Sequence, residues 1–554
     1  MLTIPCHPVF RSKTGPNGKV ICQKARLVAG RHKQIRGVNF DKMFLSAAKM
    51  TSNRVILTYV AQNDWEVHQV DVIGMYLNAE LDKEIYMLLP PGILKKGQEE
   101  KVCWLLKGPY GLKQAGRVWY KKLYTMFIND LHFTQSGVNH SVFFRHHSMA
   151  VAANSDEAIA LFKSQLGSHF ELMDLGKIPW LLGFEIKCDW VAHTISLNQK
   201  AYIESVAAKF RLVDSKKVHT PMESDMIFIK DQCSKTPINT PYWEACGSVL
   251  WAAMVTRPDI LFTIGILSQF ITNPAEIYWN ALKHVIKYLY TTKDLWLTFG
   301  GQDRTLEKYM DADWASQPHR HSISGYTFIW GDGVIIWSSK KQPIVALSTT
   351  EAKYIGATHA SKEIFWLWAL LGEFTSAFQN PTTLHCNNHF TIDLLKDNKF
   401  HTHTKHIDIC FHFVREAIEN GIISIKHIPL EDNIADIFIK PLLQQKFEHF
   451  VKLLGLHLVW GGVSNVQTLL SYPLTYSTNL CLKCPYINIL HMPLCFYSSN
   501  LIIIHFFPYQ ISTLTIFSCY HELHSHCCHL LCPCFSNLCH PSILCLHIQK
   551  HIQG

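Results

Sequence analysis

The chain has 554 residues, more than one hydrophobic core usually serves, and this length predicts two or three domains. Apolar residues make up 48% and charged residues 17%, which excludes a chain that is disordered throughout. The formal net charge of +9 permits binding to a polyanion without requiring it.

The start of the chain and its cysteines indicate a compartment. Residues 1–19 are polar and rich in Pro and Gly, so we expect no signal peptide. Eight cysteines are scattered through residues 1–460, and the other ten lie between Cys481 and Cys545. We therefore expect an intracellular protein of the cytoplasm or nucleus, not a secreted one, whose scattered cysteines are reduced thiols.

The body of the chain is predicted to mix helices and strands. Residues 64–86 alternate as a strand does, while 117–131 and 278–290 have helical spacing. Further strands are predicted at 298–300, 308–313, 325–330 and 334–337, followed by a helix over 349–371. Two α+β units result, and the polar, proline-containing stretch 215–241 is their natural boundary.

The last part of the chain has a different composition. From Gly461 to Gly554 there are one acidic residue, two lysines and no arginine, but ten cysteines and nine histidines. Translated non-coding DNA explains this best; the alternatives are a zinc site, at Cys481 and Cys484 or within 526–534, and a membrane segment over 490–520. We expect an irregular tail that is not a domain, adds nothing to folding and does not enter a membrane.

A series of short motifs follows a fixed order along residues 8–456. The earlier ones resemble the reverse transcriptase of copia-type retrotransposons, and the later ones resemble the connection and ribonuclease H of the same family. The motifs are Lys24-Ala-Arg-Leu-Val-Ala-Gly30, Trp65-Glu-Val-His-Gln-Val-Asp71, Tyr76-Leu-Asn-Ala-Glu-Leu-Asp82, Tyr110-Gly-Leu-Lys-Gln114, Leu182-Gly-Phe-Glu-Ile186, Thr256-Arg-Pro-Asp259, Asp311-Ala-Asp-Trp-Ala315, Trp337-Ser-Ser-Lys-Lys-Gln-Pro343, Lys405-His-Ile-Asp408 and Ala435-Asp436.

The resemblance implies an α+β fold, in which a right-hand polymerase of fingers, palm and thumb precedes a ribonuclease H-like α+β domain. Reverse transcriptase would occupy residues 8–214, the linker or connection 215–297 and the ribonuclease H-like domain 298–456. Residues 457–554 would be the Cys/His-rich tail. Because the family's capsid, protease and integrase parts lie upstream, we expect the chain to be a C-terminal piece of a polyprotein.

The resemblance also implies a polymerase site. Nucleotide addition uses two Mg²⁺ ions, which bind converging carboxylates. Asp71 would be a catalytic metal ligand, Tyr76 the aromatic gate under the incoming sugar, and Lys24 and Arg26 the donors to the triphosphate. Gln114 would help to hold the nucleotide. A primer-grip-like segment would consist of Leu182, Gly183, Phe184 and Glu185.

Two further carboxylates of this site should come from a Tyr-Val-Asp-Asp hairpin. The hairpin should lie between a strand at 141–145 and a helix that begins near Asp156. Residues 146–155 contain no aspartate, although the flanking residues still match the family. The sequence therefore predicts that a block was excised, by deletion or by incorrect splicing, and that polymerase activity was lost with it.

The ribonuclease H site is predicted to be altered as well. The resemblance implies Mg²⁺ bound by four carboxylates, of which Asp311 and Asp436 are present. Lys353 and Asn387 stand where the family has a glutamate and an aspartate, and Glu351 lies two residues from the first of these positions. Glu351 would substitute as a catalytic carboxylate only in a rotated helix, because residues two apart face different directions.

The resulting hypothesis is a copia-type RNA-directed DNA polymerase with a ribonuclease H region, catalytically inactive in this copy. Its partners would be an RNA template, a DNA primer, RNA–DNA hybrid and dNTPs, with Mg²⁺ as the family's cofactor. One alternative is a non-catalytic nucleic-acid-binding remnant. Another is an active enzyme whose hairpin was lost during gene annotation. The sequence does not determine the oligomeric state.

Overall fold

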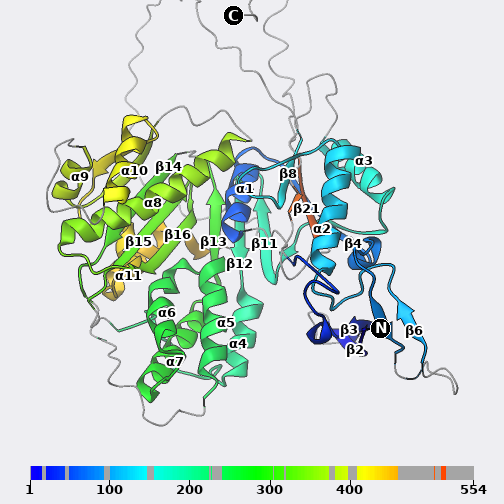
Figure 1. Ribbon diagram of the computed structural model, residues 1–554. Coiled ribbons are helices and arrows are strands. Elements are labelled where there is room, and N and C mark those ends of the chain that lie inside the picture. Colours follow the sequence, from blue (N-terminus) through cyan, green and yellow to red (C-terminus); the bar gives the residue numbers. More distant parts are fainter. Residues whose placement is uncertain are drawn as a thin grey trace, which may run out of the picture.

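The computed structural model contains helices and strands in three groups along the chain (Figure 1), which confirms the predicted α+β class. The residues that the structure describes are 2–14, 20–43, 49–90, 92, 100–145, 155–223, 226, 240–302, 305–316, 320–373, 381–396, 408–459, 504–505 and 513–518. Of the predicted linker or connection at 215–297, residues 224–225 and 227–239 lie outside the described residues, as do residues 146–154, where the missing hairpin was expected.

The N-terminal group contains several small sheets, and its helices α2 and α3 surround a core that includes Trp119, Phe127 and Phe162. Its helix α1 instead packs against β12, β13 and β16 of the other two groups. The predicted strand at 64–86 is shorter than expected, because Gly74 has a φ of 60° and turns the chain into a 3-10 helix. The elements are β1 (Thr3–Ile4), β2 (Cys6–Thr14), β3 (Val20–Ala29), α1 (Met50–Gln62), β4 (Glu66–Val72), β5 (Tyr86–Leu88), β6 (Val102–Trp104), α2 (Ala115–Thr125), β7 (Thr134–Gln135), β8 (Val142–Phe144), α3 (Ser155–Gly167) and β9 (Leu172–Lys177).

The central group pairs a five-stranded antiparallel sheet with four helices. The sheet has the order β10-β11-β12-β13-β19, so it includes a strand from residues 456–458. Residues 298–300, predicted to begin the ribonuclease H-like domain, belong to β13 of this sheet. The elements are β10 (Trp180–Leu181), β11 (Phe184–Asp189), β12 (Thr194–Asn198), α4 (Lys200–Lys209), α5 (Tyr242–Val255), α6 (Leu261–Leu267), α7 (Glu276–Thr291), β13 (Leu295–Gly300) and β19 (Leu456–Leu458).

The third group is a five-stranded mixed sheet with the order β16-β15-β14-β17-β18. The first three strands are antiparallel neighbours, whereas β14, β17 and β18 run parallel. The predicted strands at 308–313, 325–330 and 334–337 and the helix at 349–371 are all present. The elements are β14 (Leu306–Ala312), β15 (Ile323–Trp330), β16 (Gly333–Lys341), α8 (Thr349–Gly372), β17 (Thr382–Cys386), α9 (His389–Lys396), α10 (Asp408–Glu419), β18 (Ile423–His427), the 3-10 helix η8 (Ile434–Phe438) and α11 (Gln444–Leu453).

A buried arginine joins the three groups. Arg54 of α1 is 3% exposed, and its guanidinium lies 3.7 Å from the ring centroid of Trp337 on β16. It donates to Ile335 O at 2.8 Å and to Met254 O, at the end of α5, at 2.9 Å. The last carbonyls of a helix have no partner within the helix, so a cation there satisfies them and opposes the negative end of the helix dipole.

A second buried network explains the Thr256-Arg-Pro-Asp259 motif. Arg257 and Asp259 are 1% and 2% exposed and form a two-pronged ion pair, with N–O distances of 3.0 and 2.7 Å. Tyr288 of α7 donates to the same carboxylate at 2.6 Å. The pair carries no net charge and its hydrogen bonds are satisfied, which is the condition for burying ions.

The tail is not wholly irregular in the structure. Its described residues form two strands, β20 (Ile504–His505) and β21 (Thr513–Ser518), which pair with β8 and β4 of the N-terminal group. The proposed zinc clusters at 481–484 and 526–534 lie outside the described residues. None of the described helices combines the length and apolar character that crossing a bilayer requires.

Replacing Arg54 should weaken the whole fold. We expect Arg54→Met to lower the free energy of unfolding by about 2–4 kcal/mol, because buried carbonyls lose a charged donor. The measurement is urea denaturation, with Arg31→Met as the control because Arg31 is an exposed arginine. Equal midpoints for the two variants would contradict the role of Arg54 as the junction.

Lys308 on β14 gives a second prediction. It is fully buried, its Nζ has no hydrogen-bond partner, and burial lowers its pKa to about 7. Between pH 7 and about 10 the unfolded chain binds a proton that the folded chain lacks, so stability should rise with pH in this window. Lys308→Met should remove this rise and stabilise the fold by about 2–4 kcal/mol at pH 7.

The measurement is the free energy of unfolding across that pH range. Lys340→Met serves as the control, since Lys340 is exposed on β16 of the same sheet. A Lys308→Met variant with the pH dependence of the unmodified chain would contradict the prediction.

Candidate functional site

The first candidate cluster lies at the end of β4, where the sequence predicts Asp71 to be a metal ligand. The strand buries Val70 and Val72, and Asp71 lies between them, partly exposed. Its Oδ1 is buried and has no hydrogen-bond partner. A carboxylate oxygen in this state is available to a cation, because none of the described residues forms a hydrogen bond with it.

Two tyrosines and an arginine lie next to Asp71. The rings of Tyr76 and Tyr110 meet edge to face with centroids 5.0 Å apart, and the guanidinium of Arg26 lies 4.6 Å from the Tyr110 centroid. Burial raises the pKa of Tyr110, Arg26 lowers it and Asp71 raises it, so both charges act on this ring. Burial and then Tyr110 raise the pKa of Tyr76 to about 12.

The structure thus brings together Asp71, Arg26 and Tyr76, three of the predicted residues. Tyr110 lies between them. It begins the Tyr110-Gly-Leu-Lys-Gln114 motif, but the sequence predicted no function for its side chain. Its loop packs against β3, where Ala29 N donates to Tyr110 O at 2.8 Å. Gly111 permits this approach, because its φ is 99° and a Cβ there would lie 2.3 Å from Ala29 O.

Gln114 is engaged inside the protein, and the prediction for Lys24 is not tested. Gln114 is 1% exposed; its Oε1 accepts from Gln34 at 2.9 Å, and its Nε2 donates to Asn39 O at 2.8 Å. Both ends of the amide are engaged inside the protein, so Gln114 braces the 110–114 loop instead of facing Asp71. The side chain of Lys24 lies outside the described residues.

The primer-grip-like residues form a hairpin between β10 and β11. Leu182 and Gly183 have φ values of 50° and 87°, the left-handed pair typical of a two-residue turn. Phe184 is fully buried, and Glu185 pairs across the sheet with Asn198. The turn is rigidly placed, while its contact with a primer stays a prediction.

The second candidate cluster lies at the end of β14. Asp311 is 1% exposed and accepts from three groups: Lys353 Nζ, Ala312 N at 2.7 Å and Asn387 Nδ2 at 2.9 Å. Lys353 Nζ also donates to Asn387 Oδ1 at 2.6 Å. Asp311, Lys353 and Asn387 therefore form a closed ring of contacts from β14, α8 and the end of β17.

Asp436 on η8 completes this cluster. It is fully buried, and Lys440 and Lys446 each place Nζ 3.0 Å from one of its oxygens. Burial raises the pKa of Asp311, Lys353 lowers it and Asp436 raises it, so the two carboxylates act on each other. Gly325 of β15 lets η8 approach, because a Cβ there would lie 2.9 Å from Phe438 Cβ.

These residues do not fit a divalent metal ion. The ammonium of Lys353 lies between Asp311 and Asn387, and two more lysines contact Asp436, so three cations of the chain compensate two carboxylates. In the part of the chain that the structure describes, no group of three or more His, Cys, Asp or Glu side chains is placed to bind a metal. Asp71 contributes a single carboxylate to the first cluster.

Glu351 lies apart from this cluster. Its Oε2 accepts from Leu347 N at 2.8 Å, and its own amide donates to the hydroxyl of Ser348 at 3.2 Å. This arrangement resembles a capping box at the start of α8. Because Lys353 points at Asp311 from the same helix, the helix is not rotated to bring Glu351 there, so the structure does not support the suggested substitution.

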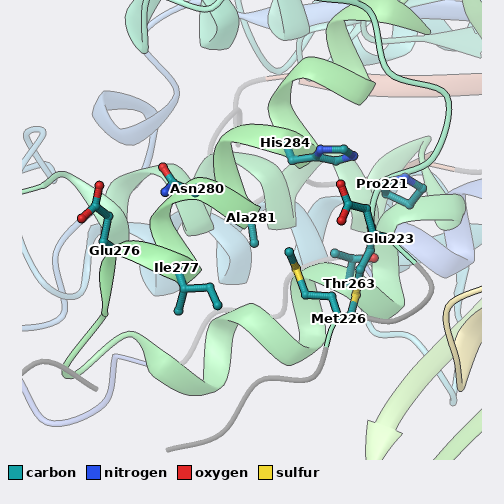
Figure 2. Close-up of a pocket in the computed structure, with 10 residues that line it drawn as sticks. Pro221, Glu223, Met226, Thr263, Glu276, Ile277, Asn280, Ala281 and His284 are labelled. Atoms are coloured by element: carbon teal, nitrogen blue, oxygen red, sulfur yellow. The ribbon is translucent and has the colours of Figure 1, made fainter. Parts of the chain in front are cut away.

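A cavity of about 510 Å³ lies elsewhere, between α6, α7 and residues 221–223 and 226. Figure 2 shows Glu223, Met226 and His284 around it. His284 is held by the carbonyl of Thr220 at 2.9 Å. None of the predicted site residues lines this cavity, so it is separate from both carboxylate clusters.

Comparison with known proteins gives consistent matches. Residues 2–224 match the family of reverse transcriptases (RNA-dependent DNA polymerases). The chain is 36% identical over 474 residues to the retrovirus-related Pol polyprotein from transposon TNT 1-94 of Nicotiana tabacum, covering 82% of this chain and 36% of that protein. It is 32% identical over 479 residues to the Pol polyprotein from transposon RE2 of Arabidopsis thaliana, covering 84% and 33%.

The chain thus spans about a third of the length of these curated relatives. Among solved structures, a foamy viral protease–reverse transcriptase in complex with RNA/DNA hybrid matches with a TM-score of 0.40 and 10% identity. That match covers 77% of this chain and 50% of the viral one.

Restoring carboxylates at the Asp311 cluster should create a metal site. We expect Mg²⁺ or Mn²⁺ to raise the melting temperature of the Lys353→Glu, Asn387→Asp double variant by about 2–5 °C, because a bound ion stabilises the folded state. The unmodified chain should show no such rise, since Lys353 already compensates Asp311. Thermal melts with metal and with chelator measure this.

Adding Glu351→Gln to the double variant is the matched control. The metal-dependent rise should persist, because the carboxylate of Glu351 faces Leu347 N. A metal-dependent rise in the unmodified chain would contradict the assignment of Lys353, and loss of the rise with Glu351→Gln would make Glu351 a ligand.

Proposed function

Because the chain belongs to the copia-type family of retrotransposon Pol polyproteins, we propose that it is the reverse transcriptase and ribonuclease H region of such a protein and binds nucleic acid without turnover. Its ancestral reactions would be RNA- and DNA-templated DNA synthesis and removal of the RNA strand from the hybrid. The observation that carries the proposal is the ammonium of Lys353 between Asp311 and Asn387.

The ribonuclease H assignment is supported by the convergence of four elements. Asp311 comes from β14, the central strand of a five-stranded sheet, and Lys353 comes from α8, which follows β16. Asn387 comes from the end of β17 and Asp436 from η8. These are the positions that the resemblance assigned to four carboxylates. Loss of turnover follows because a fixed ammonium repels the divalent ions that hybrid cleavage uses.

The polymerase assignment is supported by the cluster at Asp71. A carboxylate oxygen without a described hydrogen-bond partner, an arginine and a pair of tyrosines that meet edge to face lie together at the end of a buried strand. One carboxylate is too few to hold two ions close together, because the repulsion between the ions stays uncompensated. No step of nucleotide addition is therefore assigned to this chain.

Nucleic-acid binding is the activity that the remaining charges favour. Arg26 on β3 and Lys121 and Lys122 on α2 are exposed cations. Each contact of this kind with a phosphate releases counterions, which makes the affinity depend on salt and not on sequence. The partners proposed are therefore the family's own: RNA template, DNA primer and their hybrid.

The unmodified chain should bind a labelled RNA–DNA hybrid, yet neither extend its primer nor cut its RNA in Mg²⁺. Affinity should fall about tenfold or more between about 50 and about 200 mM salt if several phosphates are contacted. Fluorescence anisotropy and gel assays of primer and RNA length measure these outcomes. The Lys353→Glu, Asn387→Asp double variant should cut the RNA. It restores the two missing carboxylates of a site whose residues act as a unit.

The polymerase half has its own control. A roughly ten-residue strand–turn–strand carrying Tyr-Val-Asp-Asp, inserted between Ala152 and Asn154, should confer primer extension. Asp71→Asn in that variant should abolish extension again. Extension or cleavage by the unmodified chain would overturn the proposal, as would an affinity for hybrid that salt leaves unchanged.

A further inference from the structure

Among the described residues, two strands of the N-terminal group have no partner but the tail on one edge. The body of the chain pairs β4 on one side with β9, and β8 on one side with β7. Both strands are buried: Val67, Val70 and Val72 of β4 are 3% exposed or less. An edge on a buried strand leaves a row of backbone N–H and C=O groups without partners, which is costly and invites pairing with another chain.

The described part of the tail covers both edges. β21 pairs with β4 in an antiparallel register of six residues, from Ser518 opposite Glu66 to Thr513 opposite Asp71. β20 pairs with β8, with Ile504 opposite Phe143. In Figure 1 β21, drawn in orange, lies beside β8 and the helices of the N-terminal group, far in sequence from both.

The sequence of β21 suits this position. Residues 513–518 read Thr-Leu-Thr-Ile-Phe-Ser, with three β-branched residues, one aromatic residue and no charge, proline or glycine. Such segments have high strand propensity and pair readily with an exposed edge. Thr513 and Thr515 alternate with Leu514 and Ile516, and this alternation favours one register because a one-residue slip would exchange the two faces.

We propose that β20 (504–505) and β21 (513–518) are built-in strand complements of the N-terminal sheets, which close the edges of β8 and β4 by strand addition. The same edges accept a peptide of this sequence supplied separately, as in recognition by β-augmentation. The binding surface is therefore the edge of β4. Its ligand is an extended, uncharged peptide rich in β-branched residues, and in the intact chain the tail itself supplies this peptide. This assignment replaces the expectation that the tail adds nothing to folding.

A pair of cysteines tests the register directly. Gln69 and Thr515 lie opposite each other, and opposite residues of antiparallel strands have Cα atoms about 4.5–5.5 Å apart, within the range of a disulfide. Mild oxidation of the full-length Gln69→Cys, Thr515→Cys variant should give a disulfide-linked peptide in mass spectrometry. The matched control is Gln69→Cys, Leu514→Cys, in which the second cysteine points to the other face. No bond in the first variant, or equal bonding in both, would overturn the proposal.

Hydrogen exchange tests the edge itself. In a strand, consecutive amides point to opposite sides, so prolines at both Leu514 and Thr515 remove at least one bond to β4 and block the strand. Amides of β4 that face β21 should then exchange about tenfold faster or more, while those bonded to β9 stay protected. Amides of β15 and β16 should not change, which shows that the remainder is folded.

Leu530→Pro with Leu531→Pro, further along the tail, is the control and should leave β4 exchange unchanged. Adding a synthetic peptide of residues 504–518 to the Leu514, Thr515 proline variant should restore protection of β4. Unchanged β4 exchange in that variant would overturn the proposal. If the variant loses protection in β15 and β16 as well, the whole chain has unfolded. Disulfide formation in the Gln69→Cys, Thr515→Cys variant then tests the proposal, because that experiment does not disrupt the fold.

Discussion

The fold depends on how one buried cation is accommodated. Arg54 brings a positive charge from α1 into the place where the end of α5 and the strand β16 meet. Burial lowers the pKa of Arg54 to about 9, and its partners are carbonyls and an indole ring, not a carboxylate. Trp337 assists by donating to Ala253 O at 3.0 Å. At this junction the carbonyls at the end of α5 have donors, which helix-end carbonyls need wherever they are buried. The same region lies within one hydrophobic core that spans α1, the central group and the third group.

Compensation of charge also distinguishes the two carboxylate clusters. Asp311 and Asp436 are nearly inaccessible to solvent, and lysines of the chain contact both of them. An uncompensated pair of buried carboxylates would be costly, so Lys353 stabilises this fold as it excludes a divalent ion. Asp71 is partly exposed, and among the described residues no lysine contacts its buried Oδ1. A lysine placed between two buried carboxylates can therefore strengthen the structure around them.

Regular patterns predicted much of the architecture. The apolar spacing of residues 278–290 matches α7, and the run from 308 to 371 matches three strands and a helix. Motif order predicted that Asp71, Arg26 and Tyr76 would meet. The internal engagement of Gln114 could not be predicted from the sequence, because packing brings in its partners Gln34 and Asn39. The capping contact of Glu351 is local, and the Ser348-x-x-Glu351 spacing could have indicated it. Pairing of β13 with β19, and of β4 with β21, joins segments distant in sequence, which local patterns do not encode.

The pairing of β4 with β21 has a consequence for how the chain is made. About 440 residues separate Asp71 from Thr513, and ribosomes add about 5–20 residues per second, so β4 would wait about 20–90 s for its neighbour. Collapse and helix formation are complete in far less time. During synthesis the nascent chain therefore carries an apolar strand with an unfilled edge, and neighbouring copies on one messenger would meet in that state. An edge left open for that time invites pairing with the same strand of a neighbouring copy.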